Sequence, residues 1–279
     1  VSTLRQNNMV DSKQQWKAWL YLSPAIVLLL VFIGFYTYAI SPTSYSFNRT
    51  TYNHQYIDDH LNGMTIAYLS DIHLSDDKSL ERFKSIIDEL NQYPFDMVIF
   101  NGDLYDNHVF SNHEVSSLLK SIYCKYGKFA LLGDKDLNHE SEITTILNDG
   151  GFEVLNNELR TIYYNDTTFE LVASNDDISN HEYKDNTFTL CIAHKPDTFL
   201  FNKNYAELQL SGHSLGGQFY LPYIGPIFKT EGALTYNHGI YEEENATLIV
   251  SNGITGTKDN PYKFISTNHI ELITLKKGT

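Results

Sequence analysis

Cysteine is nearly absent from this 279-residue chain, which has only Cys124 and Cys191. The two residues are far apart in the sequence, and each lies inside or beside an apolar run. Neither a thiolate metal site nor a network of disulfides can therefore be argued from them. The pattern favours two buried thiols, and a single disulfide is the alternative.

Positive charge is also scarce. The chain has 20 Lys and Arg against 34 Asp and Glu, which gives a formal net charge of −14 and a pI near 5.1. No basic cluster appears after the N-terminal region. Because such a surface repels the phosphate backbone, we expect no nucleic acid partner.

Internal repeats and low-complexity segments are lacking as well. The hydrophobic content of 42% is enough to bury a sizeable core. A chain of this length suits one large domain with an appendage.

The appendage is a long uncharged run near the start of the chain. Residues 18–40 contain no charged side chain and exceed the roughly 20 residues that a helix needs to cross a bilayer. Arg5, Lys13 and Lys17 precede the run and the next basic residue is Arg49, so the positive-inside rule places the N-terminus in the cytoplasm. The pattern predicts a single-pass protein of the cell membrane with a cytoplasmic segment at residues 1–17, an anchor at 18–40, a linker at 41–63 and an extracytoplasmic domain at 64–279.

Two other interpretations of this run remain open. A cleaved signal peptide is one, because "YAIS" resembles a cleavage site, although the run exceeds the roughly 7 to 15 residues of an ordinary signal core. A helix buried in a soluble core is the other. Trp19 and Tyr21 at one end, with Tyr36 and Tyr38 at the other, are more typical of the aromatic belt of a membrane helix.

Apolar runs alternate with helical patterns in the first part of the domain. The runs are short and contain β-branched residues, which is typical of buried strands. Between them, apolar residues recur at helical spacing. Such alternation predicts parallel strands joined by crossover helices. The expected strands are at residues 65–70, 96–100 and 128–132, and the expected helices at 78–93, 112–126 and 140–147.

The second half of the domain is dominated by strand-like runs separated by turns. Two sheets packed face to face, with helices outside, would accommodate both halves of the pattern. A strand or a loop is expected to follow the linker. The runs in the second half are at residues 168–174, 188–194, 206–213, 217–222, 244–253 and 269–277.

Acidic and imidazole side chains follow five of the expected strands, taken in chain order, at the point where each strand ends. In open α/β sheets, ligands bind beyond the carboxyl ends of the strands, so we expect these side chains to converge. One such residue is usually a turn former or a helix cap, but five strand ends in succession are hard to explain in that way. The residues are Asp71 and His73 in "SDIH", Asp103 and Asp106 in "NGDLYD", Asp134 and Asp136 in "LGDKD", His194 in "AHKPD" and His213 in "SGHSLGGQ".

Carboxylates and imidazoles together suit divalent cations such as Mn²⁺, Zn²⁺ or Fe²⁺. An Asp can bridge two ions, and two ions about 3.5–4 Å apart clamp a phosphoryl group and activate a bound water. The pattern therefore predicts hydrolysis of phosphate esters with one or two divalent ions.

The order of these motifs resembles the calcineurin-like metallophosphoesterases, whose pattern runs D-x-H, G-D-x-x-D, G-N-H-[DE], a lone His and G-H-x-H. The stretches "LSDIHLS", "NGDLYDN" and "SGHSLGGQFYLPYIG" are similar to the bacterial membrane-anchored branch. The resemblance covers about residues 64–277. It implies an α/β (α+β) fold, a four-layer αββα sandwich of two mixed sheets flanked by helices, and a phosphomonoester or phosphodiester substrate.

The resemblance also implies which residues hold the metals. One ion would be held by three residues of the first two motifs, and a second ion would share the bridging Asp103. The first set is Asp71, His73 and Asp103, and the second is Asp103, Asp134, His194 and His213.

Three positions depart from the family pattern. Asp134 stands where the family has Asn, which keeps an oxygen ligand. Leu215 stands where the family has a further His ligand, which removes one donor from the first set. Lys135 stands where the family has its catalytic His, and a lysine is a poor proton donor by comparison. We therefore assign catalysis to Asp103 and Lys135 and expect reduced turnover.

Three further histidines are candidates for contact with substrate. His108 could touch substrate or lie in a solvated loop, His139 could replace the lost catalytic imidazole, and His238 could lie at the rim of the site or in an ordinary turn. Asp106 is expected to orient a ligand or cap the next helix.

Two functions fit this sequence. The first is a membrane-tethered phosphoesterase, whose position suggests a lipid-linked or envelope-derived phosphate substrate. The alternative is a pseudoenzyme that keeps the fold to bind a ligand or to act as a scaffold.

Overall fold

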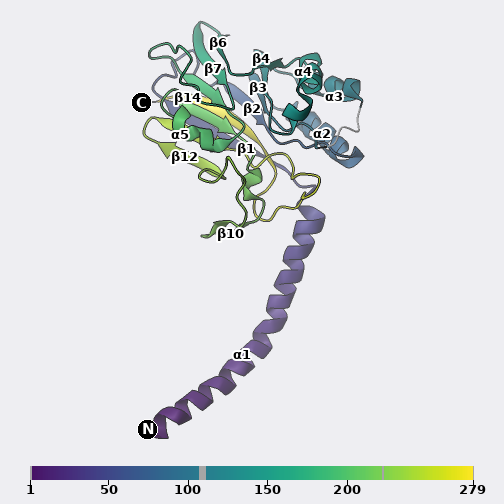
Figure 1. The fold of residues 1–279 in the computed structure, drawn as a ribbon, viewed down its shortest axis with the longest axis vertical. Helices are drawn as coiled ribbons and strands as arrows, with labels where there is room; N and C mark the ends of the chain where they lie inside the picture. The colour runs from purple at the N-terminus through teal and green to yellow at the C-terminus, as the bar shows by residue number, and fades with distance from the viewer. Residues whose placement is uncertain (1, 107–110, 222, 279) are drawn as a thin grey trace.

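The computed structural model describes residues 2–106, 111–221 and 223–278. Two six-stranded sheets pack against each other, and a long N-terminal helix extends away from them (Figure 1). Both sheets are mixed and both have helices on their outer faces. The predicted α/β fold with two mixed sheets is therefore confirmed.

The first sheet has the strand order β1-β14-β2-β3-β4-β5. Strands β2 to β5 run parallel, and β14 is antiparallel to β2 but parallel to β1. The central strands are buried on both faces, which explains their uninterrupted apolar sequences. The strands are β1 (Ser46–His54), β2 (Thr65–Leu69), β3 (Met97–Asn101), β4 (Gly127–Leu131), β5 (Glu153–Val154) and β14 (His269–Lys277).

The second sheet has the order β12-β13-β9-β8-β7-β6. Its four inner strands are parallel, and each edge strand is antiparallel to its neighbour. The sequence did not predict the edge strands β6 and β12, because edge strands in contact with water carry polar residues that dilute the apolar signal. The strands are β6 (Glu158–Tyr164), β7 (Thr167–Ala173), β8 (Thr189–Ile192), β9 (Leu208–Ser211), β12 (Gly239–Glu243) and β13 (Ala246–Val250).

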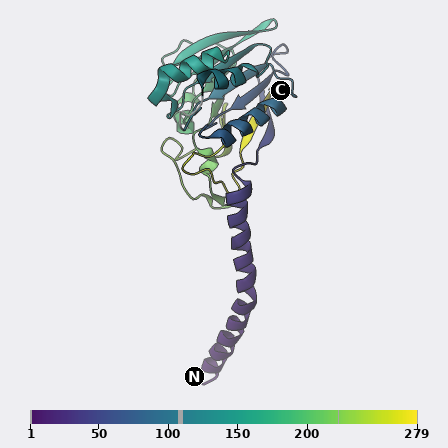
Figure 2. The same cartoon turned by 90° about the vertical axis from the view of Figure 1, so that its right-hand side faces the viewer.

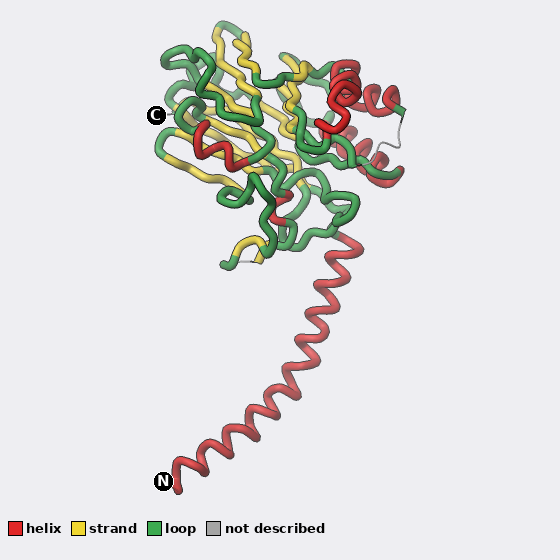
Figure 3. Tube along the Cα trace, in the orientation of Figure 1, coloured by secondary structure: helices red, strands yellow, loops and turns green. Residues whose placement is uncertain are grey.

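Helices α2 (Asp77–Leu90), α3 (Asn112–Lys120) and α4 (Glu140–Asp149) lie together on the outer side of the first sheet (Figure 3). The apolar residues that predicted α2 are all buried. Helix α3 ends earlier than the expected range of 112–126. The chain just after α3 is bonded instead to the Asn91 side chain, which follows α2. This side chain donates to the Ser121 carbonyl and accepts from the Tyr123 N–H, both at 3.0 Å.

The main core lies between the two sheets, where Tyr68 and Ile99 from the first sheet belong to one apolar cluster with Phe169 and Leu190 from the second. On the outer face of the second sheet, the short elements η3 (Pro196–Thr198) and α5 (Phe199–Asn202) pack through Phe199. The domain therefore has four layers, in the order helices, first sheet, second sheet and short helical elements. Figure 2 views the molecule from the side of α2, α3 and α4, with the strands behind these helices.

Both cysteines are free: Cys191 is completely buried and Cys124 is half-buried. The alternative of a disulfide between them is therefore wrong. Burial raises the pKa of both thiols, so neither is an activated nucleophile.

The N-terminal helix α1 (Ser2–Phe35) continues as the π-helical turn η1 (Tyr36–Ile40). Within it, Trp19–Ile40 is a run of 22 residues that is long and apolar enough to cross a membrane, and 6% of its most apolar window is buried. The interpretation as a core helix is therefore wrong. A membrane span and a signal sequence both satisfy this description.

The segment expected to be a linker, residues 41–63, is largely part of the domain. Strand β1 lies within it and pairs along its whole length with β14. Directly after the apolar run, the Lys263 N–H donates to Ser41 Oγ at 3.1 Å, and the Asn268 side-chain amide donates to the Ser41 carbonyl at 3.0 Å. The Tyr38 ring also stacks on Tyr262 with centroids 5.6 Å apart. We call residues 38–44 the anchor junction; it is packed on the domain with no free spacer.

Candidate metal centre

The predicted site residues converge where the carboxyl ends of both sheets meet. Asp71 follows β2 and Asp103 follows β3 in the first sheet, whereas His194 follows β8 and His213 follows β9 in the second. Because these strands are parallel within each sheet, their ends lie at one edge. The packing of the two sheets then brings the two groups of side chains together.

Tight turns point the side chains into this edge. Asp71, Asp103 and His213 have left-handed backbone conformations, with φ of 53°, 59° and 64°. Asp and His tolerate this region better than most residues, although it costs about 1 kcal/mol or more. The turns are tied to each other, because the Asp71 N–H donates to the Gly102 carbonyl at 3.0 Å and the His213 N–H donates to the Asp71 carboxylate at 3.1 Å.

Two glycines make room for the carboxylates. A Cβ on Gly133 would overlap the Asp103 side chain, and a Cβ on Gly212 would overlap the Asp71 side chain. Gly133 in "LGDKD" and Gly212 in "SGHSLGGQ" are therefore needed, because the carboxylates approach their backbones too closely for a side chain.

Asp71, Asp103 and His194 form the tightest group, with one ligand atom from each within 4.8 Å of the others. All three residues are buried. His194 Nε2 lies 3.5 Å from Asp103 Oδ2, and His73 Nε2 lies 3.8 Å from both Asp71 Oδ1 and Asp103 Oδ2. The first predicted ligand set is thus assembled, with Asp103 in contact distance of both histidines.

The second predicted set extends from Asp103 and His194 to His213 and Asp134. The His213 ring lies 5.2 Å from the His194 ring, and its Nδ1 is 3.6 Å from Asp134 Oδ2. His213 Nε2–H donates to the Glu231 carbonyl at 2.7 Å, so Nδ1 is the nitrogen with a free lone pair. Asp134 also pairs with Lys195 at 3.0 Å.

The orientation of the buried histidines tests whether a metal fits. His194 Nδ1–H donates to the Asn101 carbonyl, and His73 Nδ1–H donates to Asp106 Oδ1, both at 2.8 Å. Among the described residues, Nε2 of each ring is buried and has no hydrogen-bond partner. A buried nitrogen without a partner is costly, whereas an outer hydrogen bond with the inner nitrogen facing carboxylates is the usual arrangement of a metal-binding His. The donor set therefore fits a divalent cation.

The electrostatics favour positive charge at this centre. Burial raises the pKa of Asp103, but His194, His73 and the Lys135 N–H outweigh burial and hold this pKa well below its usual range. Burial has the opposite effect on His194 and lowers its pKa, but the charges of Asp103 and Asp71 outweigh burial and raise this pKa to about 10. The carboxylates therefore stabilise positive charge at this position, and a bound divalent ion would supply it.

Two buried residues act beside this centre, and sequence reasoning gave neither a defined role. Asp136 accepts from the N–H groups of Asp103, Leu104 and Gly133 at 2.8, 2.8 and 3.0 Å, which fixes the two turns together. Burial, followed by the charge of Asp103, raises its pKa to about 6. "GDKD" included this residue, but the sequence did not show that its carboxylate points back into the turns.

Lys263 is the other buried residue. It is 1% exposed, and its ammonium donates to the Asn252 carbonyl. Burial lowers its pKa to about 7, and Asp71 counteracts this shift. No signal in the sequence distinguished it from a surface lysine.

The departures from the family pattern have different surroundings. Leu215 is 7% exposed, and its carbonyl accepts from Ser266 Oγ at 2.9 Å. Lys135 is exposed, and its N–H donates to Asp103 Oδ1 at 2.9 Å. Burial raises the pKa of Asp106, but His73, the Lys258 N–H and the charge of Lys135 outweigh burial and lower this pKa. Lys135 thus reaches the centre through its backbone.

The three candidate substrate histidines are less central. His108 lies outside the described residues. His139 is exposed at the start of α4. His238 is half-buried, with Nδ1 2.7 Å from Asn252 Oδ1 and its ring 4.6 Å from the Tyr220 ring. Burial lowers its pKa, which keeps it neutral near pH 7.

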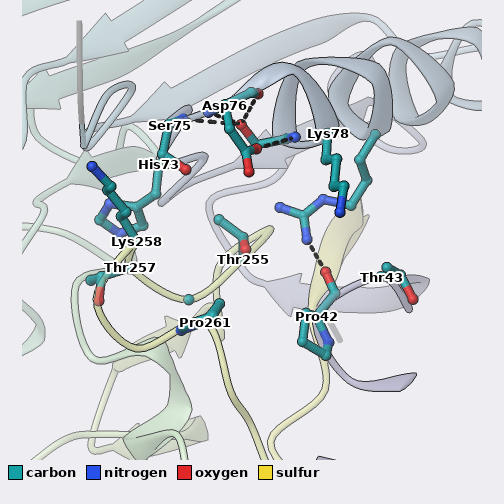
Figure 4. A pocket seen from close by; sticks show the side chains of 13 residues that line it. Pro42, Thr43, His73, Ser75, Asp76, Lys78, Thr255, Thr257, Lys258 and Pro261 are labelled. Carbon is teal, nitrogen blue, oxygen red and sulfur yellow. Dashed lines mark hydrogen bonds between the residues drawn. The ribbon is translucent and has the colours of Figure 1, made fainter. Parts of the chain in front are cut away.

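A cavity of about 280 Å³ opens beside His73 (Figure 4). It lies between the N-terminal end of α2, the loop around Lys258 and the anchor junction at Pro42 and Thr43. Lys78 and Arg82 add positive charge to its wall, and the Arg82 guanidinium donates to the Pro42 carbonyl. One wall is therefore shared with the candidate centre and another with the end of the apolar helix.

Comparison with known proteins decides the family. Residues 64–217 match the calcineurin-like phosphoesterase family. The chain belongs to this family. An uncharacterized metallophosphoesterase of Bacillus subtilis, YkuE, is 31% identical over 87% of this chain and 90% of its own length.

More distant similarities extend to other organisms. A transmembrane protein with a metallophosphoesterase domain from Danio rerio is 23% identical over 78% of this chain, which spans 54% of that protein. Among solved structures, the phosphopantetheinyl hydrolase of Mycobacterium tuberculosis is 8% identical, with a TM-score of 0.42. The match covers 71% of the present chain and 90% of the hydrolase.

Asp106 offers a test of the candidate centre away from the predicted ligands. We expect Asp106→Asn to weaken Mn²⁺ binding by about 10- to 100-fold, because His73 loses the carboxylate that orients its ring. Isothermal titration with Mn²⁺ measures the effect. Asp88→Asn, an exposed change on α2, is the control and should bind as the parent does. Equal affinity in all three folded proteins would contradict the orienting role.

Proposed function

We propose that this protein hydrolyses phosphomonoesters or phosphodiesters with one or two divalent ions such as Mn²⁺, Zn²⁺ or Fe²⁺. The observation that carries this proposal is the pair of buried Nε2 atoms of His73 and His194, which face Asp71 and Asp103 and have no hydrogen-bond partner in the described part of the chain. Family membership supplies the reaction class. The charge of −14 supports the expectation that nucleic acid is not a partner.

Two ligand sets are proposed around Asp103. Bound ions would neutralise phosphoryl charge and lower the pKa of a water molecule so that it can attack phosphorus. The protein orients the donors through Asn101 and Asp106 and excludes water from the inner nitrogens. The sets are Asp71, His73 and Asp103 on one side, and Asp103, Asp134, His194 and His213 on the other.

Lys135 is proposed as the second catalytic residue. Its ammonium is exposed and its backbone is held by Asp103, so the side chain can reach a phosphate bound over the centre. There its ammonium would offset the negative charge of the phosphate. Together with the missing donor at Leu215, this supports a lower turnover than in a chain with the full family pattern.

Replacing Asp103 tests the proposed reaction. We expect Asp103→Asn to lower Mn²⁺-dependent hydrolysis of bis-p-nitrophenyl phosphate by at least about 100-fold, because the residue contacts both halves of the centre. Release of p-nitrophenol is the measurement, and Asp149→Asn on the exposed face of α4 is the control. If the parent and Asp103→Asn are equally inactive with Mn²⁺, Zn²⁺ and Fe²⁺, the enzyme proposal fails.

A catalytically inactive pseudo-phosphoesterase is the second candidate, and the side chain at position 215 favours it. A buried Leu there cannot ligate a metal. On this proposal the domain binds a phosphate-bearing ligand or acts as a scaffold, with one ion or none. His139 and His238 would then serve, if at all, in binding.

Restoring the family residues separates the two candidates. We expect Leu215→His combined with Lys135→His to raise turnover of bis-p-nitrophenyl phosphate by about 10- to 100-fold over the parent, because a donor and a proton-transfer group return. Metal content by mass spectrometry should rise with it. A variant that gains metal without gaining activity would favour the pseudo-phosphoesterase.

The apolar helix is proposed to be a retained single-pass anchor, with residues 1–17 in the cytoplasm and the domain outside. The close packing of Ser41 on the domain supports retention of the helix. Cleavage before Ser41 would remove Tyr38 and leave Tyr262 without its stacking partner. The basic residues before the run support the orientation.

This location and the cavity support a lipid-linked or envelope-derived substrate. The cavity connects the anchor junction at Pro42 with His73, and Lys78 and Arg82 would attract an anionic head group. A phosphate carried at the membrane surface could therefore approach the centre without leaving the bilayer.

Two lysines on α2 test this substrate class. We expect Lys78→Gln to lower phosphate release from phosphatidic acid in vesicles by about fivefold, since one basic residue near a membrane surface contributes about 1 kcal/mol. Hydrolysis of soluble bis-p-nitrophenyl phosphate should change much less. Lys84→Gln, on the same helix but outside the cavity, is the control. Equal losses on both substrates would argue against a head-group site.

A further inference from the structure

An uncharged hairpin projects from the domain beside the apolar helix. The sequence from Phe219 to Phe228 contains no charged residue. Its two arms, β10 (Tyr220–Leu221) and β11 (Gly225–Pro226), pair antiparallel. Figure 1 shows β10 on the same side of the domain as α1.

The side chains of this hairpin are unusually exposed for apolar residues. Ile224 is 78% exposed and Phe228 is 64% exposed, and Tyr223 and Ile227 are also exposed. Leaving apolar surface in water is unfavourable by about 25 cal/mol for each Å². Such surfaces mark sites of contact with another protein or a membrane.

The base of the hairpin is fixed next to the anchor junction. The Tyr220 N–H donates to the Phe264 carbonyl at 3.0 Å, and the Phe264 N–H donates to the Gln218 carbonyl at 2.8 Å. The neighbouring residue, Lys263, donates from its N–H to Ser41 Oγ at 3.1 Å. One short stretch, residues 262–264, therefore holds both the end of the apolar helix and the start of the hairpin.

Because residues 262–264 hold both the hairpin and the end of the apolar helix, the surroundings of the helix end are also those of the hairpin. If Trp19–Ile40 crosses a bilayer, Ser41 lies at the membrane surface, and no spacer separates it from the domain. The residues bonded to the same stretch must then lie near the head groups. Tyr, Ile and Phe side chains partition into this interfacial layer.

We propose that the hairpin is a second membrane contact, whose exposed side chains enter the interfacial layer of the bilayer that holds α1. The insertion is shallow, because the unpaired backbone groups of a two-stranded hairpin cannot enter hydrocarbon. Two contacts, the helix and the hairpin, would restrict rotation of the domain about the anchor and hold the cavity at the membrane surface. The inference rests on the proposed anchor, and it is independent of catalysis.

Depth-dependent fluorescence quenching tests this contact in the full chain. The parent carries Cys124→Ser, which leaves the completely buried Cys191 as its only thiol. Single cysteines are placed at Ile224 and at Phe228, labelled with an NBD dye, and reconstituted in phosphatidylcholine vesicles that contain a lipid with a nitroxide near its head group. Phe35→Cys in the apolar helix is the positive control. Tyr163→Cys is the matched control, because Tyr163 is 77% exposed on β6, on the opposite side of the domain from α1 (Figure 1).

We expect the nitroxide to quench the dye at positions 224 and 228 at least about twofold more than the dye at position 163. Quenching at 224 and 228 no greater than at 163, while position 35 is quenched, would place the hairpin in water or against another protein copy and overturn the proposal. Loss of quenching at position 35 would remove the anchor on which the proposal rests and overturn it too. Hydrolytic activity does not enter the readout, so failure of the proposed reaction would leave this result unchanged.

Discussion

The desolvated carboxylate of Asp103 is the point on which the two halves of the molecule depend. It belongs to the first sheet, but its nearest imidazole, His194, belongs to the second, and the two lie 3.5 Å apart. Burial would raise the pKa of a lone carboxyl group, yet the surrounding donors reverse this and keep Asp103 ionised. An ionised group in this position requires a compensating cation. The need for a cation at this position therefore depends on the packing of the two sheets, which brings Asp103 and His194 together.

Rigidity around this carboxylate comes from the backbone rather than from the predicted ligands themselves. Asp136 accepts from the N–H groups of both turns that flank the centre, and the absence of a side chain at Gly133 lets those turns approach. Asn101 and Asp106 set the ring orientation of His194 and His73. The departures at Leu215 and Lys135 thus lie in a scaffold whose orienting contacts are intact. A scaffold of this kind is compatible with slow catalysis and with ligand binding alone.

The same domain also holds the anchor junction by specific hydrogen bonds. Residues 262–264 connect Ser41, the exposed hairpin and, through the buried ammonium of Lys263, the Asn252 carbonyl. A few residues further along, the Thr255 N–H donates to the Asp71 carbonyl at 3.2 Å. The end of the apolar helix and the candidate centre are therefore linked through a few bonded residues.

Local patterns in the sequence determined the existence of the apolar helix, the buried parallel strands and the acidic and imidazole residues at their ends. Those features depend on periodicity and on residue type, which are properties of short stretches, and the family motifs added the grouping into two ligand sets. Edge strands such as β12 were missed because their side chains alternate between water and the sheet. The roles of Asp136 and Lys263 were decided only by tertiary structure. The Asp136 carboxylate accepts from a turn 32 to 33 residues earlier in the chain, and the Lys263 ammonium is buried against the carbonyl of another loop. Both contacts depend on which segments the folded sheets bring together, and no local pattern records them.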